Sequence, residues 1–439
     1  MENLLFARAQ MGMSLAFHIL FACAGIAMPL LMVIAEVAWL RTGKGVYHDL
    51  TRAWAKGTAV LFAVGAVSGT VLSFELGLLF PRFMEHAGPI IGMPFSLEGF
   101  AFFAEAIFLG VYLYGWDRIK PWLHVGAGVL VAISGAMSAV FVIIANAWMN
   151  APRGFRFENG EFLDIDPIAA MGTPMAPHLI IHMLVAAYMG TAFAVAGIHA
   201  AVLLKSPRSS FHRKALGIAL SLAIPMALVQ PLVGDWSAKQ VATHQPAKLA
   251  AMEGQYRTEA GAPLRIGGIS DDEAMETRFA IEIPGGLSFL AFGSFDATVK
   301  GLEEFPRDEW PPTATHYSFQ IMVGLGMALL ALSLWAVLLW YRKRDLTISR
   351  KFLIATVIAS PFGFLAVEFG WFVTEFGRQP WVIYNVLRTA DTVTPMPGLV
   401  VPFTVFTLVY LGLAAAVIAI LYRQVRRSPD AIAREEVVP

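Results

Sequence analysis

Nine apolar segments recur along the 439 residues of the chain, and each has roughly the length that crosses a bilayer. The connections between them are mostly short, apart from 149–177 and a polar stretch at 235–312. The segment at 214–234 is the shortest of the nine. This pattern predicts an all-α integral membrane protein with nine transmembrane helices, at residues 13–40, 53–80, 94–116, 122–148, 178–204, 214–234, 314–341, 351–373 and 398–422.

Basic residues alternate between the two sides of this arrangement. Connections rich in Lys and Arg, at 41–56, 118–120, 205–214, 342–351 and 423–427, alternate with connections that hold few. Because basic connections stay in the cytoplasm, we expect the N-terminus outside and the C-terminus in the cytoplasm. The chain then divides into helices one to six (1–234), an outer loop (235–312), and helices seven to nine with a cytoplasmic tail (313–439).

Composition agrees with a membrane location and argues against several classes of function. Hydrophobic residues make up 57% of the chain and charged residues 15%, against about 25% charged in a typical soluble domain. A formal net charge of zero gives no electrostatic support for nucleic-acid binding. The single cysteine, Cys23, excludes an internal disulfide, a CxxCH haem attachment and a cysteine-held iron–sulfur cluster. The apolar run 11–40 is too long for a signal-peptide core, so we expect a first span there.

Ionisable and metal-ligating side chains lie inside these segments. A charged group at the centre of a span costs at least about 2.5–3.5 kcal/mol, so each one suggests a function. Glu98 and Glu105 are seven residues apart and therefore share a helix face. The full set is His18, Glu75, Glu98, Glu105, His178, His182, Met322, Glu368 and Glu375.

Five of these residues fall at one membrane level. With the N-terminus outside, His18, Glu98, His182, Met322 and Glu375 all lie near the outer ends of their helices. Histidine and methionine are ordinary axial ligands of haem iron, whereas a carboxylate is a weaker ligand that leaves a position open for dioxygen. The layer therefore suggests haem near the outer face.

Each residue also has a simpler explanation. His18 could serve only as a hydrogen-bonding group, Met322 as core packing, and Trp371, Trp381 and Arg378 as interfacial anchors. For His178 an interfacial position is favoured over a zinc site of HxxxH type.

Three alternative classes stay open at this point. Glu98, Glu105 and Glu375 would also suit a secondary transporter. A haem–copper oxidase needs more histidines inside helices than remain once His48, His86, His212 and His244 are assigned to connections. A structural subunit without haem would not need the ligand layer.

The segment "GWFVTEFGRQPW" (370–381) is highly specific, and it resembles the hallmark of subunit I of cytochrome bd-type quinol oxidases. "RAQMGMSLAFHILF", "LEGFAFFAEAIFLGVYLYGWDR", "ANAWMN", "KLAAMEGQYRT" and "QIMVGLGM" match the same family in order, so the resemblance covers nearly the whole chain. The outer loop is the family's short form. "SFELG" and "QIM" are similar to the cyanide-insensitive branch.

The resemblance implies a ligand for each haem. His182 and Met322 match the axial pair of a low-spin haem b. His18 and Glu375 match the proximal ligands of two high-spin haems, one haem b and one haem d or third haem b, and which ligand serves which haem stays open. The residues Arg8, Trp371, Arg378 and Gln379 match positions near the haem edges.

The resemblance also implies roles for the remaining polar residues. Glu98 and Glu105 match carboxylates of the oxygen-reducing site and its proton supply, and Ser138 and Asn146 are their expected hydrogen-bonding partners. Lys248 and Glu253 match the quinol-binding positions of the outer loop. Two positions depart from the family: Gln320 replaces an arginine found in some members, and Glu75 replaces a neutral residue.

As a member of this family the chain would be the haem-bearing subunit of a terminal quinol oxidase in the bacterial cytoplasmic membrane. It would oxidise quinol at the outer face and reduce dioxygen to water with cytoplasmic protons, separating charge without a pump. A second membrane subunit, and in some members a small accessory chain, would accompany it. The sequence does not distinguish ubiquinol from menaquinol.

Overall fold

Nine helices in the described part of the chain are long and apolar enough to cross a membrane, as predicted. The computed structural model describes residues 2–426, so Arg427 and the rest of the predicted tail lie outside it. The spans are α1 (Glu2–Thr42), α2 (Gly45–Leu79), α3 (Pro81–Tyr114), α4 (Pro121–Asn150), α6 (Ala176–Lys205), α7 (Ser210–His244), α10 (Ala314–Lys343), the pair α11 (Arg350–Ala359) and α12 (Phe362–Phe376), and α13 (Val400–Arg426).

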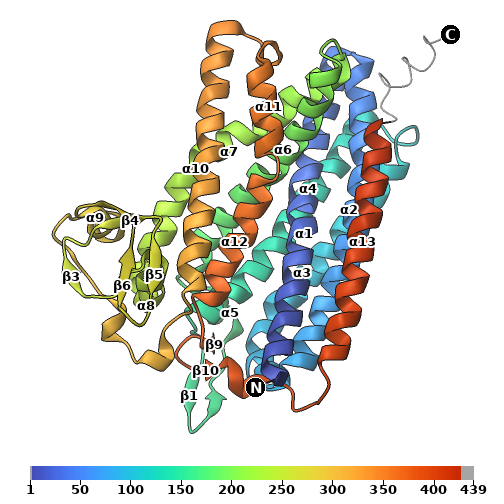
Figure 1. Ribbon diagram of the computed structural model, residues 1–439. Helices are drawn as coiled ribbons and strands as arrows, with labels where there is room; N and C mark the ends of the chain where they lie inside the picture. The colour runs from blue at the N-terminus through green and yellow to red at the C-terminus, as the bar shows by residue number, and fades with distance from the viewer. Residues whose placement is uncertain (1, 427–439) are drawn as a thin grey trace.

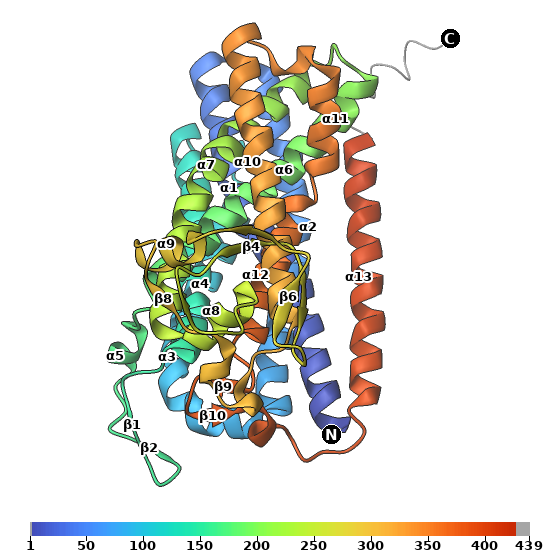
Figure 2. The ribbon, with the colours of Figure 1, turned by 60° about the vertical axis from the view of Figure 1, so that its left-hand side comes forward.

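The bundle is arranged around α1 and α6 (Figures 1 and 2). Helix α1 packs against α2, α4 and α6, and α6 packs against α7, α11 and α12. Helix α13 stands at one edge in both views and contacts α1 and α2. Without a hydrophobic drive between helices in lipid, small residues that let backbones approach provide the packing.

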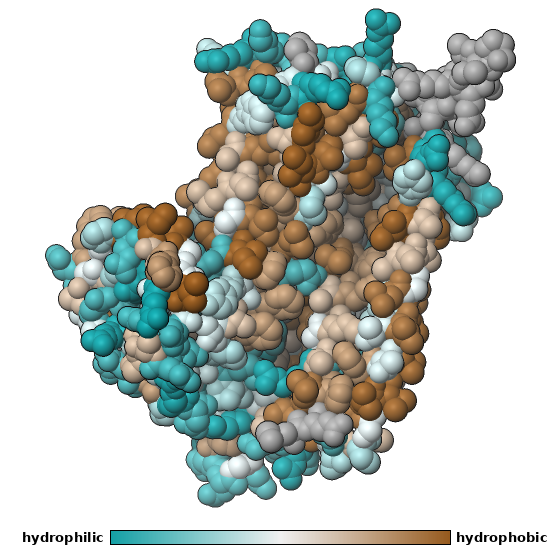
Figure 3. All heavy atoms as spheres, viewed as in Figure 1, coloured by the Kyte–Doolittle hydropathy of each residue, from teal (hydrophilic) through white to brown (hydrophobic). Residues whose placement is uncertain are grey.

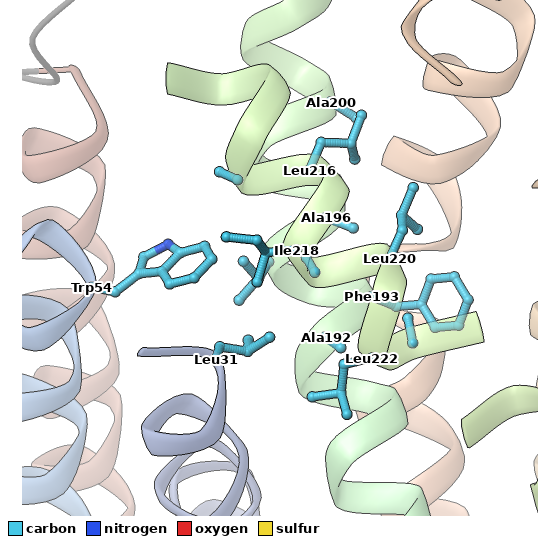
Figure 4. Close-up of a cluster of buried hydrophobic side chains, with 14 of the residues drawn as sticks. Leu31, Trp54, Ala192, Phe193, Ala196, Ala200, Leu216, Ile218, Leu220 and Leu222 are labelled. Atoms are coloured by element: carbon cyan, nitrogen blue, oxygen red, sulfur yellow. The ribbon is translucent and has the colours of Figure 1, made fainter. Parts of the chain in front are cut away.

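Small residues do line the core. Ala192, Ala196 and Ala200 of α6 are buried, and Leu216 and Leu220 of α7 fill the space beside them (Figure 4). The same cluster reaches Leu31 of α1 and Trp54 of α2. These contacts fix α6 relative to α7 and therefore fix where the predicted ligand His182 lies.

The eighth span is two helices rather than one. Helix α11 ends at Ala359 and α12 begins at Phe362, on either side of Ser360 and Pro361. Proline has no amide proton to donate and its ring clashes with the preceding turn, so it interrupts the helix. Just after the break, Gly363 lies against Gly190 of α6, and a Cβ added to Gly363 would be 2.2 Å from the Gly190 Cα. Glycine at both positions lets α12 meet α6.

Short elements connect the remaining spans. Between α4 and α6 are a hairpin, β1 (Arg156–Glu158) and β2 (Glu161–Leu163), and the helix α5 (Pro167–Met171). The α12–α13 connection holds β9 (Trp381–Ile383), β10 (Leu387–Arg388) and the 3-10 helix η4 (Thr389–Thr392). A further 3-10 helix, η3 (Leu346–Ile348), joins α10 to α11.

The long outer loop folds into a lobe beside α7 and α10 (Figure 1). It consists of three antiparallel strand pairs with two short α-helices and two 3-10 helices. The pairs are β3 (Glu259–Ala260) with β8 (Thr298–Val299), β4 (Leu264–Ile266) with β7 (Ile281–Ile283), and β5 (Ile269–Asp271) with β6 (Glu276–Arg278). The helices are α8 (Pro246–Glu253), α9 (Gly286–Phe292), η1 (Leu302–Glu304) and η2 (Arg307–Glu309).

Helix α7 is longer than the apolar segment that predicted it. It continues from residue 234 to His244, so the lobe begins at Gln245 rather than at 235. The added residues 235–244 mix polar and apolar side chains, so hydropathy does not mark them as part of a span. They remain helical: Lys239 donates to Asp235 one turn earlier, at 2.6 Å.

The lobe and the described start of the chain lie toward the same end of the bundle, and α13 ends toward the opposite end (Figure 1). Basic residues close α1, α6, α10 and α13 at that opposite end. We call the end with the lobe the lobe end, and the other the basic end.

Candidate functional site

His18 of α1 lies against α2. Its Nδ1 is 3.0 Å from the Ser68 hydroxyl. Gly69 gives the ring its space, because a Cβ at that position would be 2.9 Å from His18 Cε1. The ring is half-buried. A predicted ligand is therefore held in a fixed orientation by a hydroxyl and a glycine on the neighbouring helix.

His182 of α6 faces α7. Its Nε2 is 3.2 Å from the Gln230 side-chain nitrogen. Its Nδ1 and the Gln230 Oε1 are both buried without a hydrogen-bond partner. Gly234, one turn after Gln230, leaves open the space next to the ring: a Cβ there would be 3.9 Å from His182 Cε1.

Met322 of α10 lies against α12. A Cβ added to Gly370 would be 3.1 Å from the Met322 sulfur, so any larger residue there would press on the thioether. Helices α6 and α10 both contact α7 and α12. His182 and Met322 therefore project from two helices that share the same neighbours.

Glu375 ends α12 in a network of charged and amide groups. One carboxylate oxygen accepts from Asn146 at 2.8 Å, and the other accepts from Arg378 at 2.6 Å. Arg378 is only 2% exposed, and its Nε and Nη1 have no partner. On α12 itself, Trp371 Nε1 is another buried donor that has no partner. The stretch from Trp371 to Arg378 thus carries an ion-paired carboxylate and three buried donor atoms without a partner, which are uncommon in native structures.

The carboxylates of α3 face α4. Ser138 donates to Glu98 at 3.1 Å, as the sequence suggested. Glu105 is 6% exposed and lies against Gly135, where an added Cβ would be 3.2 Å from its carboxyl carbon. Asn146 differs from expectation: it binds Glu375 rather than either α3 carboxylate. It is eight residues beyond Ser138 on α4, about two turns closer to the lobe end.

Lys248 of α8 reaches into the bundle. Its Nζ lies 3.4 Å from Asn150 Oδ1, 3.4 Å from Gln245 Oε1 and 3.5 Å from the Thr374 carbonyl. Burial lowers the pKa of Lys248 to about 7, with a further contribution from the nearby Arg378 charge that Glu375 partly offsets. Asn150 in turn donates to Asn146, which binds Glu375. Polar contacts therefore link the predicted quinol residue to the predicted haem ligand.

Glu253 ends α8 and is 5% exposed, with its Oε2 unpartnered. Burial raises the pKa of Glu253 to about 8, partly offset by the positive charge of Arg265. A carboxyl group with this pKa changes charge near neutral pH, which suits a proton acceptor.

Other predicted residues lie less centrally. Arg8 is exposed. Gln379 contacts the site through the Glu375 carbonyl, at 3.4 Å. His178, for which we expected an interfacial position, is fully buried, with Nδ1 3.0 Å from Ser237 Oγ, because α7 continues past the predicted end and covers it. Within the described residues no three His, Cys, Asp or Glu side chains gather to hold a metal.

Several contributors were missed from the sequence. Gln230 and Asn150 are polar residues at apolar segments, a signal that was available. Gly370 carried no signal, because its role depends on α10 packing against it. Glu368 was noted but given no role, and both its carboxylate oxygens are buried without a partner. Glu75 accepts from Gln10 of α1 at 2.8 Å.

Comparison with known proteins decides among the alternatives. The family model described as cytochrome bd terminal oxidase subunit I matches residues 6–429. The chain belongs to the cytochrome bd terminal oxidase subunit I family. The family resemblance read from the sequence is thereby confirmed, and the secondary transporter, the haem–copper oxidase and the haem-free structural subunit are set aside.

Individual members of the family match over nearly the whole chain. A protein named putative cytochrome bd menaquinol oxidase subunit I, from Bacillus subtilis (strain 168), is 40% identical over 98% of both chains. Cytochrome bd-II ubiquinol oxidase subunit 1 of Escherichia coli (strain K12) is 28% identical over 98% of both. The solved bd oxidase of Geobacillus thermodenitrificans superposes with a TM-score of 0.92 at 38% identity, covering 97% of this chain and 99% of that one. Like these relatives, the chain is a multi-pass protein of the bacterial cytoplasmic membrane.

A bd oxidase subunit implies haem, and the site residues fit it. An axial haem ligand needs only one side-chain atom toward the iron, so the lack of a three-residue metal cluster is no obstacle. The unpartnered Nδ1 of His182 shows a buried imidazole with one nitrogen uncommitted. The unpartnered donors of Arg378 and Trp371 suit anionic haem propionates.

Proposed function

We propose that this chain is the haem-bearing subunit of an electrogenic terminal quinol oxidase, which oxidises quinol at the outer face and reduces dioxygen to water with cytoplasmic protons. The carrying observation is the polar connection from Lys248 through Asn150 and Asn146 to Glu375. Through this connection Lys248, a buried and titratable residue of the loop, is linked to Glu375, a carboxylate that could ligate haem iron. The relatives named menaquinol and ubiquinol oxidases support the same reaction class.

His182 and Met322 would hold a low-spin haem b, and His18 and Glu375 would hold two high-spin haems, one haem b and one haem d or a third haem b. When bound, these haems supply electron transfer and dioxygen reduction. The chain's own contribution is orientation: Ser68 and Gly69 fix His18, Gln230 fixes His182, and Gly370 leaves room for the Met322 sulfur. Arg378 anchors Glu375 through its ion pair, and its two free donors, with Arg8, Trp371 and Gln379, would bind haem edges.

Lys248 and Glu253 would bind the quinol head group and receive its protons. Both are buried, and their pKa values of about 7 and about 8 lie near neutral pH. A neutral amine and an ionised carboxylate each accept a proton. The lobe, predicted as 235–312, would thus be the quinol-binding unit, and its protons would leave on the outer side.

Protons for water formation would come from the opposite side. Glu105 lies almost two turns deeper in α3 than Glu98, on the same face. Glu105 would pass protons to Glu98, which Ser138 holds by its hydrogen bond. Asn146 would extend the path at Glu375 rather than at the α3 carboxylates. Uptake from the cytoplasm and release outside would generate proton-motive force without pumping.

The chain would not act alone. Subunit I of a bd oxidase works with a subunit II, and we propose a second membrane subunit here, together with a small accessory chain in the complete complex. Exposed apolar residues of α2 and α3, among them Phe74, Phe100 and Phe103, leave surface for lipid or for such a subunit.

The proposed ligand set is tested by replacing Met322 with leucine in the purified complex. Because leucine cannot ligate iron, Met322→Leu should abolish the low-spin haem b band in reduced-minus-oxidised spectra. Met327→Leu is the matched control, since Met327 lies on the same helix but is exposed on its outer surface. A low-spin band that persists in Met322→Leu would refute the axial assignment. Pyridine-haemochrome analysis of the wild type would distinguish haem b from haem d, and a colourless protein would refute the oxidase proposal.

A further inference from the structure

The β4–β7 ribbon of the lobe is built with its apolar side outward. Its pairs are Ile266 with Ile281, Arg265 with Glu282, and Leu264 with Ile283. Since side chains alternate between the faces of a ribbon, the isoleucines share one face and the charged pair lies on the other. Ile266, Ile281 and Ile283 are 49%, 69% and 46% exposed; on the other face the Arg265 side chain is 14% exposed and the Glu282 side chain 51% exposed. A ribbon with one face on a core and the other in water would turn the isoleucines inward.

Neighbouring elements extend this surface. Phe279, just before β7, is 88% exposed. In α9 one side is buried through Leu287 and Ala291, packed with the end of α7, yet Phe289 and Phe292 on the other sides are also exposed. A helix that is apolar all round is typical of a non-aqueous setting. We call Ile266, Phe279, Ile281, Ile283, Phe289 and Phe292 the lobe apolar face.

The lobe apolar face lies toward the middle of the bundle. In Figures 1 and 2, β4 and α9 lie nearer the middle, whereas α8 and β6 lie nearer the lobe end. Figure 3 shows apolar residues along the edge of the lobe that faces the middle, with hydrophilic residues on its remaining visible sides. The apolar surface therefore points along the bundle axis rather than into the surrounding water.

A pair of hydrogen bonds fixes the depth. The Gly267 amide donates to Gln320 Oε1 at 3.0 Å, and Gln320 donates to the Arg265 carbonyl at 3.0 Å. Gln320 is six residues inside α10, so Ile266 is held about 9 Å along the axis from the helix start. A 30-residue helix measures about 45 Å, which matches a hydrocarbon core of about 30 Å with headgroup layers on both sides. Ile266 therefore lies at the boundary between headgroups and acyl chains.

We infer that the lobe apolar face is inserted into the lipid leaflet at the lobe end, so that the lobe is partly embedded in the membrane beside α7 and α10. Lipid is the occupant because this face continues the exposed apolar surfaces of those spans, where Leu232 and Ile321 are 71% and 41% exposed. Trp236 of α7 and Tyr317 of α10 are also exposed at this level, as expected of an interfacial aromatic belt. The inference rests on membrane location and does not depend on the quinol assignment.

Site-directed fluorescence tests the insertion. The chain's single cysteine is fully buried, so a cysteine introduced at the surface can be labelled alone, with the unmodified complex as background. Ile281→Cys and Phe292→Cys would carry an NBD label on the lobe apolar face. Glu273→Cys is the control: this exposed residue lies at the β5–β6 turn, next to Asp272, which accepts a hydrogen bond from Thr313 at the start of α10.

The labelled complex would be placed in phosphatidylcholine nanodiscs, and quenching of the NBD fluorescence would be measured in two ways. The first quencher is 5-doxyl phosphatidylcholine in the bilayer, and the second is iodide in the aqueous phase. We expect the two face labels to be quenched by the doxyl lipid and protected from iodide, with a lipid-to-iodide quenching ratio several-fold above that at residue 273. Equal iodide quenching at all three positions would overturn the inference, because the face would then be in water. Protection from both quenchers would also overturn it, because another protein chain would then cover the face.

Discussion

At the scale of single residues, the site combines paired and unpaired groups. Glu375 has two partners, Asn146 and Arg378, and is fixed by them. Arg378 and Glu253 each keep buried atoms without a partner. An unsatisfied buried polar group costs about 1–3 kcal/mol, which makes the unpaired atoms of Arg378 and Glu253 candidates for binding the proposed haem and quinol. The paired atoms hold Glu375 in place.

The elevated pKa of Glu253 leads to a pH-dependent prediction. A carboxyl group with a pKa of about 8 is protonated at low pH and becomes a base as pH rises through that value. We expect kcat/KM for quinol to increase with pH through about 8. Arg265 of β4 and His316 of α10, which contacts the Met252 carbonyl, are the neighbouring charged or titratable groups.

Glu253→Gln should lower quinol kcat/KM by about 10²-fold, in the range typical of a lost general base, and should remove the rise near pH 8. All haem bands should remain. Glu273→Gln, an exposed change elsewhere in the lobe, should leave both rate and pH profile unaltered. A pH profile in Glu253→Gln that keeps the same rise would show that another group is the base.

At the scale of elements, the site depends on helix breaks and on cross-links between elements. The α11–α12 break lets Gly363 contact α6, and α12 then carries Gly370 and Glu375 to their partners. Gln320 connects β4 of the lobe to α10 only two residues before Met322. A position where some family members have arginine thus serves here as a backbone-binding amide.

Gln320→Ala should loosen the lobe without removing a haem ligand. It deletes two hydrogen bonds to backbone groups, the Arg265 carbonyl in β4 and the Gly267 amide just after it, worth about 0.5–1.5 kcal/mol each. We expect faster cleavage of the lobe by added protease and a higher KM for quinol, with an unchanged low-spin haem spectrum. Gln424→Ala is a suitable control, because Gln424 binds the Ala53 carbonyl near the basic end. Loss of the low-spin haem would instead assign Gln320 a role at the ligand.

At the scale of the whole molecule, the candidate haem ligands and the candidate quinol-binding residues lie toward the same end. By their positions along their helices, His18 and Glu375 lie toward the lobe end, where α8 carries the buried loop residues, and Glu105 lies beyond the midpoint of α3. The charge-rich connections lie at the other end. The proposed cofactor layer near one face would make proton uptake from the opposite face electrogenic.

The proposed function requires the lobe end to be outside the cytoplasm. Basic connections at the opposite end predict a cytoplasmic C-terminus. Green fluorescent protein fused after residue 439 should therefore fluoresce in cells, and alkaline phosphatase fused there should be inactive. The reverse pattern would place the lobe in the cytoplasm and would contradict oxidation of quinol at the outer face.

Much of the fold could be predicted because membrane insertion depends on local properties. A span needs a long apolar run, and each run is visible without knowing its neighbours. The polar end of α7 and the break at Pro361 were not foreseen. Helix α7 continues through residues that hydropathy counts as loop, and one proline does not interrupt the apolar run.

The candidate ligand residues could be proposed for a related reason. Histidine, glutamate and arginine are rare in spans, so His182, Glu375 and Arg378 stand out in the sequence. Their partners did not, since alanine, glycine and amide residues are common in any helix. Asn146 was assigned to the wrong carboxylates because sequence spacing gives the depth of a residue but not the helix it faces.

The sequence by itself determined the number of spans and the family, because these depend on which residues occur and how far apart they are. Only the tertiary structure decided that Gly370 borders Met322, that Lys248 connects to Glu375, and that the lobe turns isoleucines outward beside α10. Those facts depend on which helix faces meet, and helix rotation and strand pairing are set by packing between segments far apart in the chain.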